Sequence, residues 1–154
     1  MLRDRLNEDL KLAVRNKDQR AVSTIRLILA ALRDRDLCAR ERGESVSEQE
    51  ILQMMQAMIK QRRESIALFE QGCRMDLAEQ EQEELQVIQS FLPDQMTTRE
   101  IVSAVDSVIG EIAGQDHRTV GLKDMGRIMS TLRERYAGRM DFGQASAAAK
   151  SRLA

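Results

Sequence analysis

The sequence predicts an all-α protein, and three observations support this prediction. Apolar residues recur every three or four positions, no stretch alternates apolar and polar residues as a half-buried strand does, and glycine and proline are scarce. Apolar residues make up 42% and charged residues 32% of the 154 positions, which is typical of amphipathic helices around a core. We expect a four-helix domain in residues 1–93 and a three-helix bundle in residues 94–154, with the only proline, Pro93, at the boundary.

Apolar periodicity predicts the first two helices. The first covers about residues 2–16, with apolar residues four positions apart. The second follows a polar corner at residues 16–18 and continues into the charged run 33–36, whose alternating signs are typical of a solvated turn. The residues expected to be buried are Leu2, Leu6, Leu10, Val14, Ala21, Ile25, Ile28, Leu29 and Leu32.

Capping signals delimit the third and fourth helices. Ser47 followed by Glu50 forms a capping box, so the third helix begins there, and Gly72 is its expected C′ residue. The fourth is expected over about residues 75–92, where Pro93 stops it. Its outer face should carry Glu79, Glu81, Glu83 and Glu84. The expected buried residues are Ile51, Met55, Met58, Ile59, Arg62, Ile66 and Phe69 in the third helix, and Leu77, Leu85, Ile88 and Phe91 in the fourth.

Three more helices are expected after Pro93. Thr97 and Glu100 form a second capping box that begins a helix running to Gly114. A loop over residues 115–121 contains His117, the only histidine. The next helix carries the stripe Leu122, Met125, Met129, Leu132 and Tyr136 and ends at Gly138. Asp141 with Gln144 caps the last helix, which carries Ala145, Ala149 and Leu153.

The residue types give little support for catalysis, and we assign no catalytic residue, cofactor or metal ligand. A nucleophilic triad would require His117 to meet Cys73 or a serine, and a solvated loop histidine is the expected case. One histidine and two distant cysteines do not make a zinc site. The pair Glu83 and Glu84 is expected to lie on a hydrated helix face.

The expected location is cytoplasmic, with Cys38 and Cys73 reduced. The N-terminal residues do not resemble a signal peptide, and no apolar run approaches the roughly 20 residues that cross a bilayer. We therefore expect no membrane contact.

Charge is divided unevenly along the chain. From Thr97 onward nine basic and seven acidic residues give a net charge of +2, whereas the preceding residues carry −3. Few aromatic residues are available for base stacking, so an RNA contact would use the phosphate backbone. The residues predicted to make it are Lys123, Gly126, Arg127, Arg133 and Arg139.

Three features leave two interpretations each. Gly126, inside a predicted helix, permits either a close helix crossing or the close approach of an RNA backbone or partner. In a possible second patch of Lys60, Arg62 and Arg63, Arg62 lies on the apolar stripe. Its head either pairs with a carboxylate of the first or fourth helix, or the patch contacts phosphate. The methionines of the third helix form either core or an adaptable binding face.

Two separate runs of the sequence resemble the GatB/YqeY family. The first comprises Lys60-Gln61-Arg62-Arg63-Glu64-Ser65-Ile66, Phe69, Gly72, Arg74, Asp76-Leu77-Ala78-Glu79, Glu81, Glu84-Leu85 and Phe91-Leu92-Pro93. The second comprises Asp124-Met125-Gly126-Arg127-Ile128-Met129, Gly138-Arg139, Asp141, Lys150 and Leu153. The resemblance covers essentially the whole chain. Ser130 stands where the family commonly has a second glycine, and Met140 and Phe142 vary a turn of commonly small residues.

The resemblance implies an N-terminal helical domain and a C-terminal domain similar to the tail of GatB, a component of the glutamine-dependent aspartyl/glutamyl-tRNA amidotransferase. That tail is thought to help bind tRNA, while the chemistry belongs to a cradle domain absent here. The resemblance therefore implies a non-catalytic module that contacts tRNA or another structured RNA. The alternatives are a component of carbon–nitrogen ligase activity with glutamine as amido donor, or a protein–protein adaptor. Protein partners would then be amidotransferase or aminoacyl-tRNA synthetase components.

Overall fold

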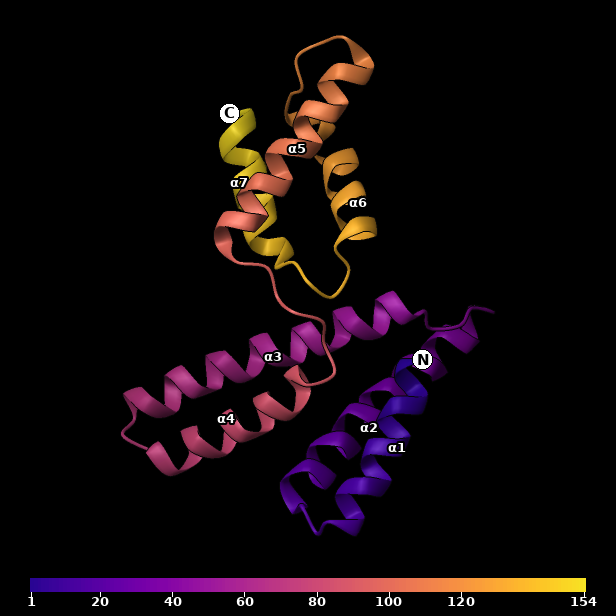
Figure 1. Ribbon diagram of the computed structural model, residues 1–154, viewed down its shortest axis with the longest axis vertical. Coiled ribbons are helices and arrows are strands. Elements are labelled where there is room, and N and C mark those ends of the chain that lie inside the picture. Colours follow the sequence, from indigo (N-terminus) through magenta and orange to yellow (C-terminus); the bar gives the residue numbers. More distant parts are fainter. The chain divides into compact units, whose positions relative to one another are not determined.

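The computed structural model describes all 154 residues and contains helices but no strands, as predicted (Figure 1). Its elements are α1 (Leu2–Arg15), α2 (Gln19–Glu41), α3 (Glu48–Gln71), α4 (Met75–Gln89), α5 (Thr98–Asp116), the 3-10 helix η1 (Leu122–Asp124), α6 (Met125–Arg135) and α7 (Phe142–Leu153). They form two compact units, Met1–Pro93 and Asp94–Ala154, and each unit has a core of its own. None of the helices combines the length and the apolar character that crossing a membrane requires.

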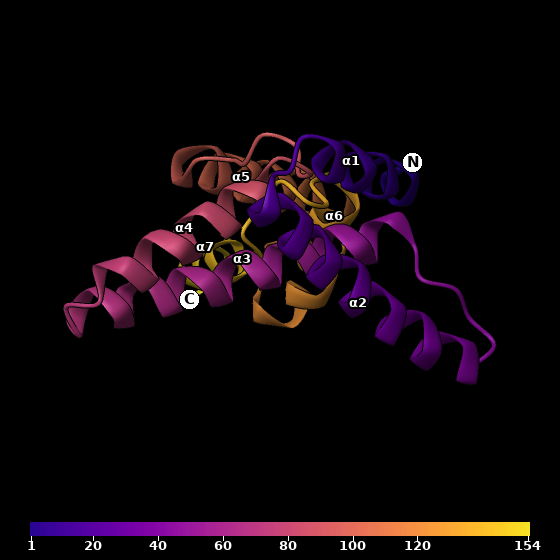
Figure 2. The same cartoon turned by 90° about the horizontal axis from the view of Figure 1, so that it is seen from below.

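The first unit consists of two antiparallel helical hairpins. Figures 1 and 2 both show α1 beside α2 and α3 beside α4, and α4 also packs against α2. The most buried core residues are Leu2, Leu6, Ile25, Ile28, Leu32, Ile51, Met54, Met55, Ile59, Leu85, Ile88 and Phe91. Burial of these side chains is the main source of stability.

The apolar stripe predicted for α1 is correct at its beginning and wrong at its end. Leu2 and Leu6 are buried and Leu10 is half-buried, but Val14 is exposed and Ala13 is buried in its place. Residues four positions apart differ by about 40° around a helix of 3.6 residues per turn, so three such steps carry a side chain off the core face.

Both predicted capping boxes are confirmed. The Ser47 hydroxyl accepts a hydrogen bond from the Glu50 amide (3.2 Å), and the Glu50 carboxylate accepts one from the Ser47 amide (2.8 Å). Thr97 and Glu100 repeat this arrangement at the start of α5, with distances of 3.3 and 2.7 Å. Asp141 caps α7 by accepting from the amides of Gly143 and Gln144.

The helix ends differ from the prediction in their details. Gly72 does end α3, but its φ is −82°, and the left-handed residue is Cys73 with φ 56°. Lys17 and His117 have the same left-handed conformation after α1 and α5. α4 ends at Gln89 rather than near residue 92. The amides of Phe91 and Leu92 instead bond the carbonyls three residues back, which tightens the chain before Pro93.

In the second unit α5 packs against both α6 and α7, which also contact each other. The core residues are Ile101, Ala104, Val105, Val108, Ile112, Val120, Ile128, Met129, Leu132, Met140, Ala145 and Ala149. Leu122, expected on the apolar stripe, lies in η1 and is exposed, whereas Ile128 is fully buried. The change from 3-10 to α-helical geometry at Met125 shifts the phase of the stripe.

Candidate functional site

The structure supports the structural interpretation of Arg62 in the first basic patch. Its guanidinium lies 3.1 Å from the Glu84 carboxylate of α4, and the two side chains are only 14% and 12% exposed. Glu84 also contacts Arg20 of α2 at 3.4 Å. The expectation that Glu84 lies on a hydrated face was therefore wrong, because two arginines hold it at the junction of three helices. Lys60 and Arg63 remain exposed on α3.

The residues predicted to contact RNA lie in and around α6. Lys123 is in η1, and Gly126 and Arg127 belong to the first turn of α6. Arg133 lies in the last turn, and Arg139 lies in the turn before α7. All five are exposed, and the charge of Lys123 acts on the neighbouring Asp124 carboxylate without a direct ion pair.

Most of these cations have partners within the unit. The Arg127 guanidinium lies 2.9 Å from Asp116 and donates to Gln115 at 2.8 Å. Arg133 lies over the Phe142 ring, 5.8 Å from its centroid, and Arg139 donates to the Asp94 carbonyl at 3.3 Å. The ion pair between Arg127 and Asp116 is exposed, and pairs of this kind contribute roughly 0–1 kcal/mol, so it holds Arg127 only weakly.

Gly126 is not explained by close helix packing. A Cβ built at this position would have no atom within 4 Å, and the residue is exposed. Of the two interpretations of Gly126, the close helix crossing is therefore not supported, since no other helix lies within 4 Å of a Cβ at this position. The backbone at the start of α6 is therefore open to a partner from outside the unit.

Sequence reasoning missed the role of Arg118, which anchors the segment before α6. Its guanidinium forms a bidentate ion pair with the buried Asp124 carboxylate, at 2.7 and 3.0 Å, and also contacts the Asp116 carboxylate at 3.1 Å. The Asp124 carboxylate accepts a further hydrogen bond from the Gly121 amide at 2.9 Å. The Arg118 guanidinium and the Gly121 amide hold the pKa of Asp124 well below its ordinary value. The available signal was an acidic residue three positions after Gly121, the spacing at which a carboxylate accepts from the amide at the start of a helical turn.

This network makes the second unit sensitive to acid. Because the pKa of Asp124 is lowered on folding, its contribution to stability is present above the unfolded pKa, near 4, and is lost as the pH falls further. We expect Asp124→Asn to lower the urea midpoint of this unit at pH 7, and the difference from the unmodified chain to shrink at pH 3. The control is Glu134→Gln, which removes the same charge from an exposed position of α6. A deficit that is equal at both pH values would contradict this assignment.

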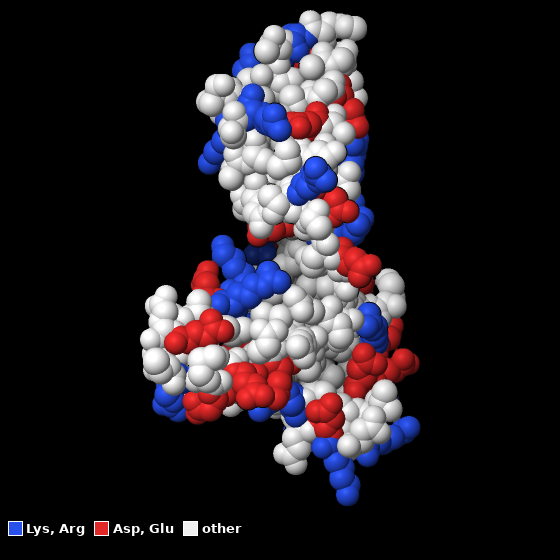
Figure 3. All heavy atoms as spheres, turned by 60° about the vertical axis from the view of Figure 1, so that its left-hand side comes forward, with Lys and Arg blue, Asp and Glu red and all other residues white.

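No arrangement of catalytic side chains is evident. His117 is exposed at the end of α5, and Cys38 and Cys73 are exposed free thiols. No group of three or more histidine, cysteine or acidic residues is arranged to hold a metal ion. On the face of the second unit shown at the top of Figure 3, basic side chains stand in small groups among uncharged and acidic ones.

Comparison with known proteins finds one family and a set of named relatives. The family model described as "Yqey-like protein" matches residues 3–153. Three relatives, each named "Altered inheritance of mitochondria protein 41, mitochondrial", come from Lachancea thermotolerans, Pyrenophora tritici-repentis and Eremothecium gossypii. Their identities are 30%, 32% and 29%, over 77%, 85% and 70% of this chain. The matches span 63%, 71% and 58% of the relatives' own lengths, less than two thirds in two cases.

These relatives overturn the expected cytoplasmic location, because their names place them in mitochondria. The expectation depended on reduced thiols and on an N-terminus unlike a signal peptide. Neither property distinguishes the cytosol from the interior of an organelle, so the residues could not have decided this point.

Proposed function

The chain belongs to the YqeY-like protein family, and from this membership we propose that its second unit contacts tRNA or another structured RNA and catalyses no reaction of its own. In this proposal Met1–Pro93 and Asp94–Ala154 are the two functional domains, and the second is similar to the tail of the amidotransferase component GatB.

The observation that carries the proposal is the surface at the start of α6. Lys123, Gly126 and Arg127 are all exposed within one short segment, and Gly126 leaves the backbone between the two cations open. The helix dipole attracts negative charge to the start of α6, where the amides of Asp124 and Met125 already bond to carbonyls of the preceding turn. Flanking lysine and arginine side chains would add the charge that positions a nucleic-acid backbone.

The existing ion pairs do not block this contact. Arg127 is 46% exposed in its pair with Asp116, and an exposed pair of this kind costs at most about 1 kcal/mol to break. A phosphate could therefore replace the carboxylate, and Lys123 has no competing ion pair. The mixed charge of the surface supports local contacts with a folded RNA rather than general attraction to polyanions.

Titration of labelled tRNA at about 50 and about 200 mM salt tests the proposal. We expect the double variant Lys123→Gln/Arg127→Gln to bind more weakly at low salt, because two phosphate contacts are lost. The slope of log affinity against log salt should fall by roughly 1.5 to 2, since each contact contributes slightly less than one unit. Gly126→Ala keeps the charges and meets no atom of the protein, so weaker binding by this variant would locate the RNA at this surface.

The matched control is Arg26→Gln/Arg33→Gln, which removes the same charge from exposed positions of α2 in the first unit. This variant should bind tRNA like the unmodified chain. The proposal fails if the chain does not bind tRNA at low salt, if binding does not depend on salt, or if both double variants lose affinity equally.

A further inference from the structure

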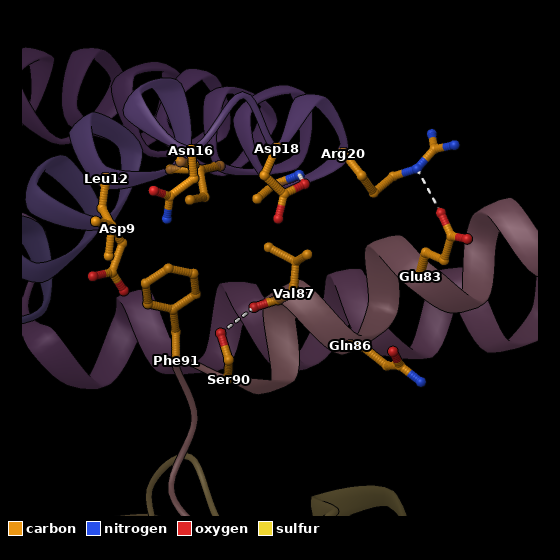
Figure 4. A pocket seen from close by; sticks show the side chains of 13 residues that line it. Asp9, Leu12, Asn16, Asp18, Arg20, Glu83, Gln86, Val87, Ser90 and Phe91 are labelled. Atoms are coloured by element: carbon orange, nitrogen blue, oxygen red, sulfur yellow. Dashed lines mark hydrogen bonds and ion pairs between the residues drawn. The ribbon is translucent and has the colours of Figure 1, made fainter.

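A groove in the first unit has no role in the proposed RNA contact. It lies between the C-terminal half of α1, the start of α2 and the C-terminal half of α4, with a volume of about 540 Å³ (Figure 4). This volume falls within the roughly 300–1,000 Å³ of ligand-binding pockets. Apolar side chains line much of it, among them Leu12, Val87 and Phe91.

Leu12 is the unusual member of this lining. It lies on α1 beside the core yet is 53% exposed, whereas Phe91 across the groove is buried. In Figure 4 the side chains of Leu12, Val87 and Phe91 border the same opening. Contact of this exposed leucine with water is unfavourable. Burying it under the apolar surface of a partner would therefore favour binding.

The charges of the groove are mainly negative. Its acidic lining residues are Asp9, Asp18 and Glu83, and its one basic residue is Arg20. Arg20 is already engaged by Glu83 at 3.0 Å and by Glu84 at 3.4 Å. Arg5, over the adjoining Phe91 ring, forms a long, exposed ion pair with Asp9 at 3.8 Å.

Asp18 is the carboxylate most open to a new cation. One of its oxygens caps α2 by accepting from the Ala21 amide at 3.1 Å, and no basic side chain pairs with it. The groove therefore combines an apolar floor with acidic groups that the unit itself neutralises incompletely.

We propose that this groove docks a cationic amphipathic helix of a partner protein. Its apolar residues, at i, i+3 or i+4 and i+7, would cover Leu12, Val87 and Phe91. Lysine or arginine side chains flanking that stripe would reach Asp9 and Asp18. Charge complementarity selects this occupant, since an acidic or neutral segment would leave Asp18 without a cationic partner and Asp9 with only its long, exposed pair to Arg5.

A designed peptide pair tests the proposal on the full chain. One peptide carries the leucine stripe flanked by lysines, and its partner carries glutamate at every lysine position. Titration of the ¹⁵N-labelled chain with the lysine peptide should shift amide signals from the end of α1, the start of α2 and the second half of α4. The glutamate peptide should bind at least about tenfold more weakly, as expected for a charge-selective groove.

Two variants and one control locate the site. Leu12→Ser should weaken binding of the lysine peptide by about tenfold, or about 1.4 kcal/mol, because covering a half-exposed leucine removes apolar surface from water. Asp9→Lys should weaken binding of the lysine peptide and strengthen binding of the glutamate peptide. Leu37→Ser, at an equally exposed leucine of α2 outside the groove, should change neither affinity.

Several results would overturn the proposal. They are the absence of shifts at about millimolar peptide, equal binding of the two peptides, shifts away from the groove, and equal losses for Leu12→Ser and Leu37→Ser. If the same amides shift when the chain alone is concentrated, the occupant is a second copy and the proposal is wrong.

Discussion

Replacing Glu84 with glutamine is expected to destabilise the first unit by about 3 kcal/mol. The Glu84 carboxylate faces Arg62 at 3.1 Å and Arg20 at 3.4 Å, and the Arg62 Nε is buried without a hydrogen-bond partner. Removing the negative charge leaves the Arg62 guanidinium with only the more distant Glu81 carboxylate, at 3.9 Å, and breaking a buried pair costs roughly 3–5 kcal/mol. We place the cost at the lower end because both side chains retain some contact with water. Urea unfolding followed by circular dichroism, with amide signals of residues 1–93 assigning the transition, measures the loss.

The neighbouring residue supplies the control. Glu83 pairs with the same Arg20 at 3.0 Å, but its side chain is 50% exposed, so Glu83→Gln should cost less than about 1 kcal/mol. The double variant Arg62→Met/Glu84→Gln should recover most of the loss, because no enclosed charge remains without a partner. Equal effects of Glu83→Gln and Glu84→Gln would refute the importance of burial here.

Ile128→Ala is expected to unfold most or all of the second unit. Ile128 is completely buried, and truncation of such a side chain to alanine costs roughly 2–5 kcal/mol through lost burial and the remaining cavity. A unit the size of Asp94–Ala154 rarely has more than about 3–5 kcal/mol of stability, so this one change approaches the total. In ¹⁵N–¹H spectra the dispersed signals of residues 94–154 should collapse, and any tRNA binding should disappear with them.

The matched change Ile128→Val removes one methylene and should cost about 0.5–1.5 kcal/mol, which leaves the unit folded. Signals of residues 1–93 should keep their dispersion in both variants, because the cores of the two units share no residue. A fully dispersed spectrum for Ile128→Ala would show that the site relaxes around the deletion or that the unit is far more stable than its size suggests.

Local signals in the sequence were sufficient to predict the helices and most of their starting points. The capping residues Ser47, Thr97 and Asp141 are confirmed because each bond joins a side chain to a backbone amide only two or three residues away. The end of α3 was located at Gly72 for the same reason, although the left-handed residue proved to be Cys73.

Contacts between helices could not be predicted in this way. Glu84 was assigned to a hydrated face because its neighbours in sequence are acidic, and only the packing of α2 and α3 against α4 brings two arginines to it. Arg118 lies in the loop after α5 and Asp124 lies six positions later in η1, so no single helical period relates them. The candidate RNA-contacting residues were chosen from the charge distribution and the family resemblance, whereas the ion pair between Arg127 and Asp116 needs the fold of the α5–α6 connection.

Lys17, Cys73 and His117 each hold a backbone conformation that L-amino acids adopt at a cost of the order of 1 kcal/mol. Glycine would relax each of these turns, and the natural sequence has not used it at any of the three. Replacing any of these three exposed residues with glycine is therefore a route to a more stable protein that leaves both cores unchanged.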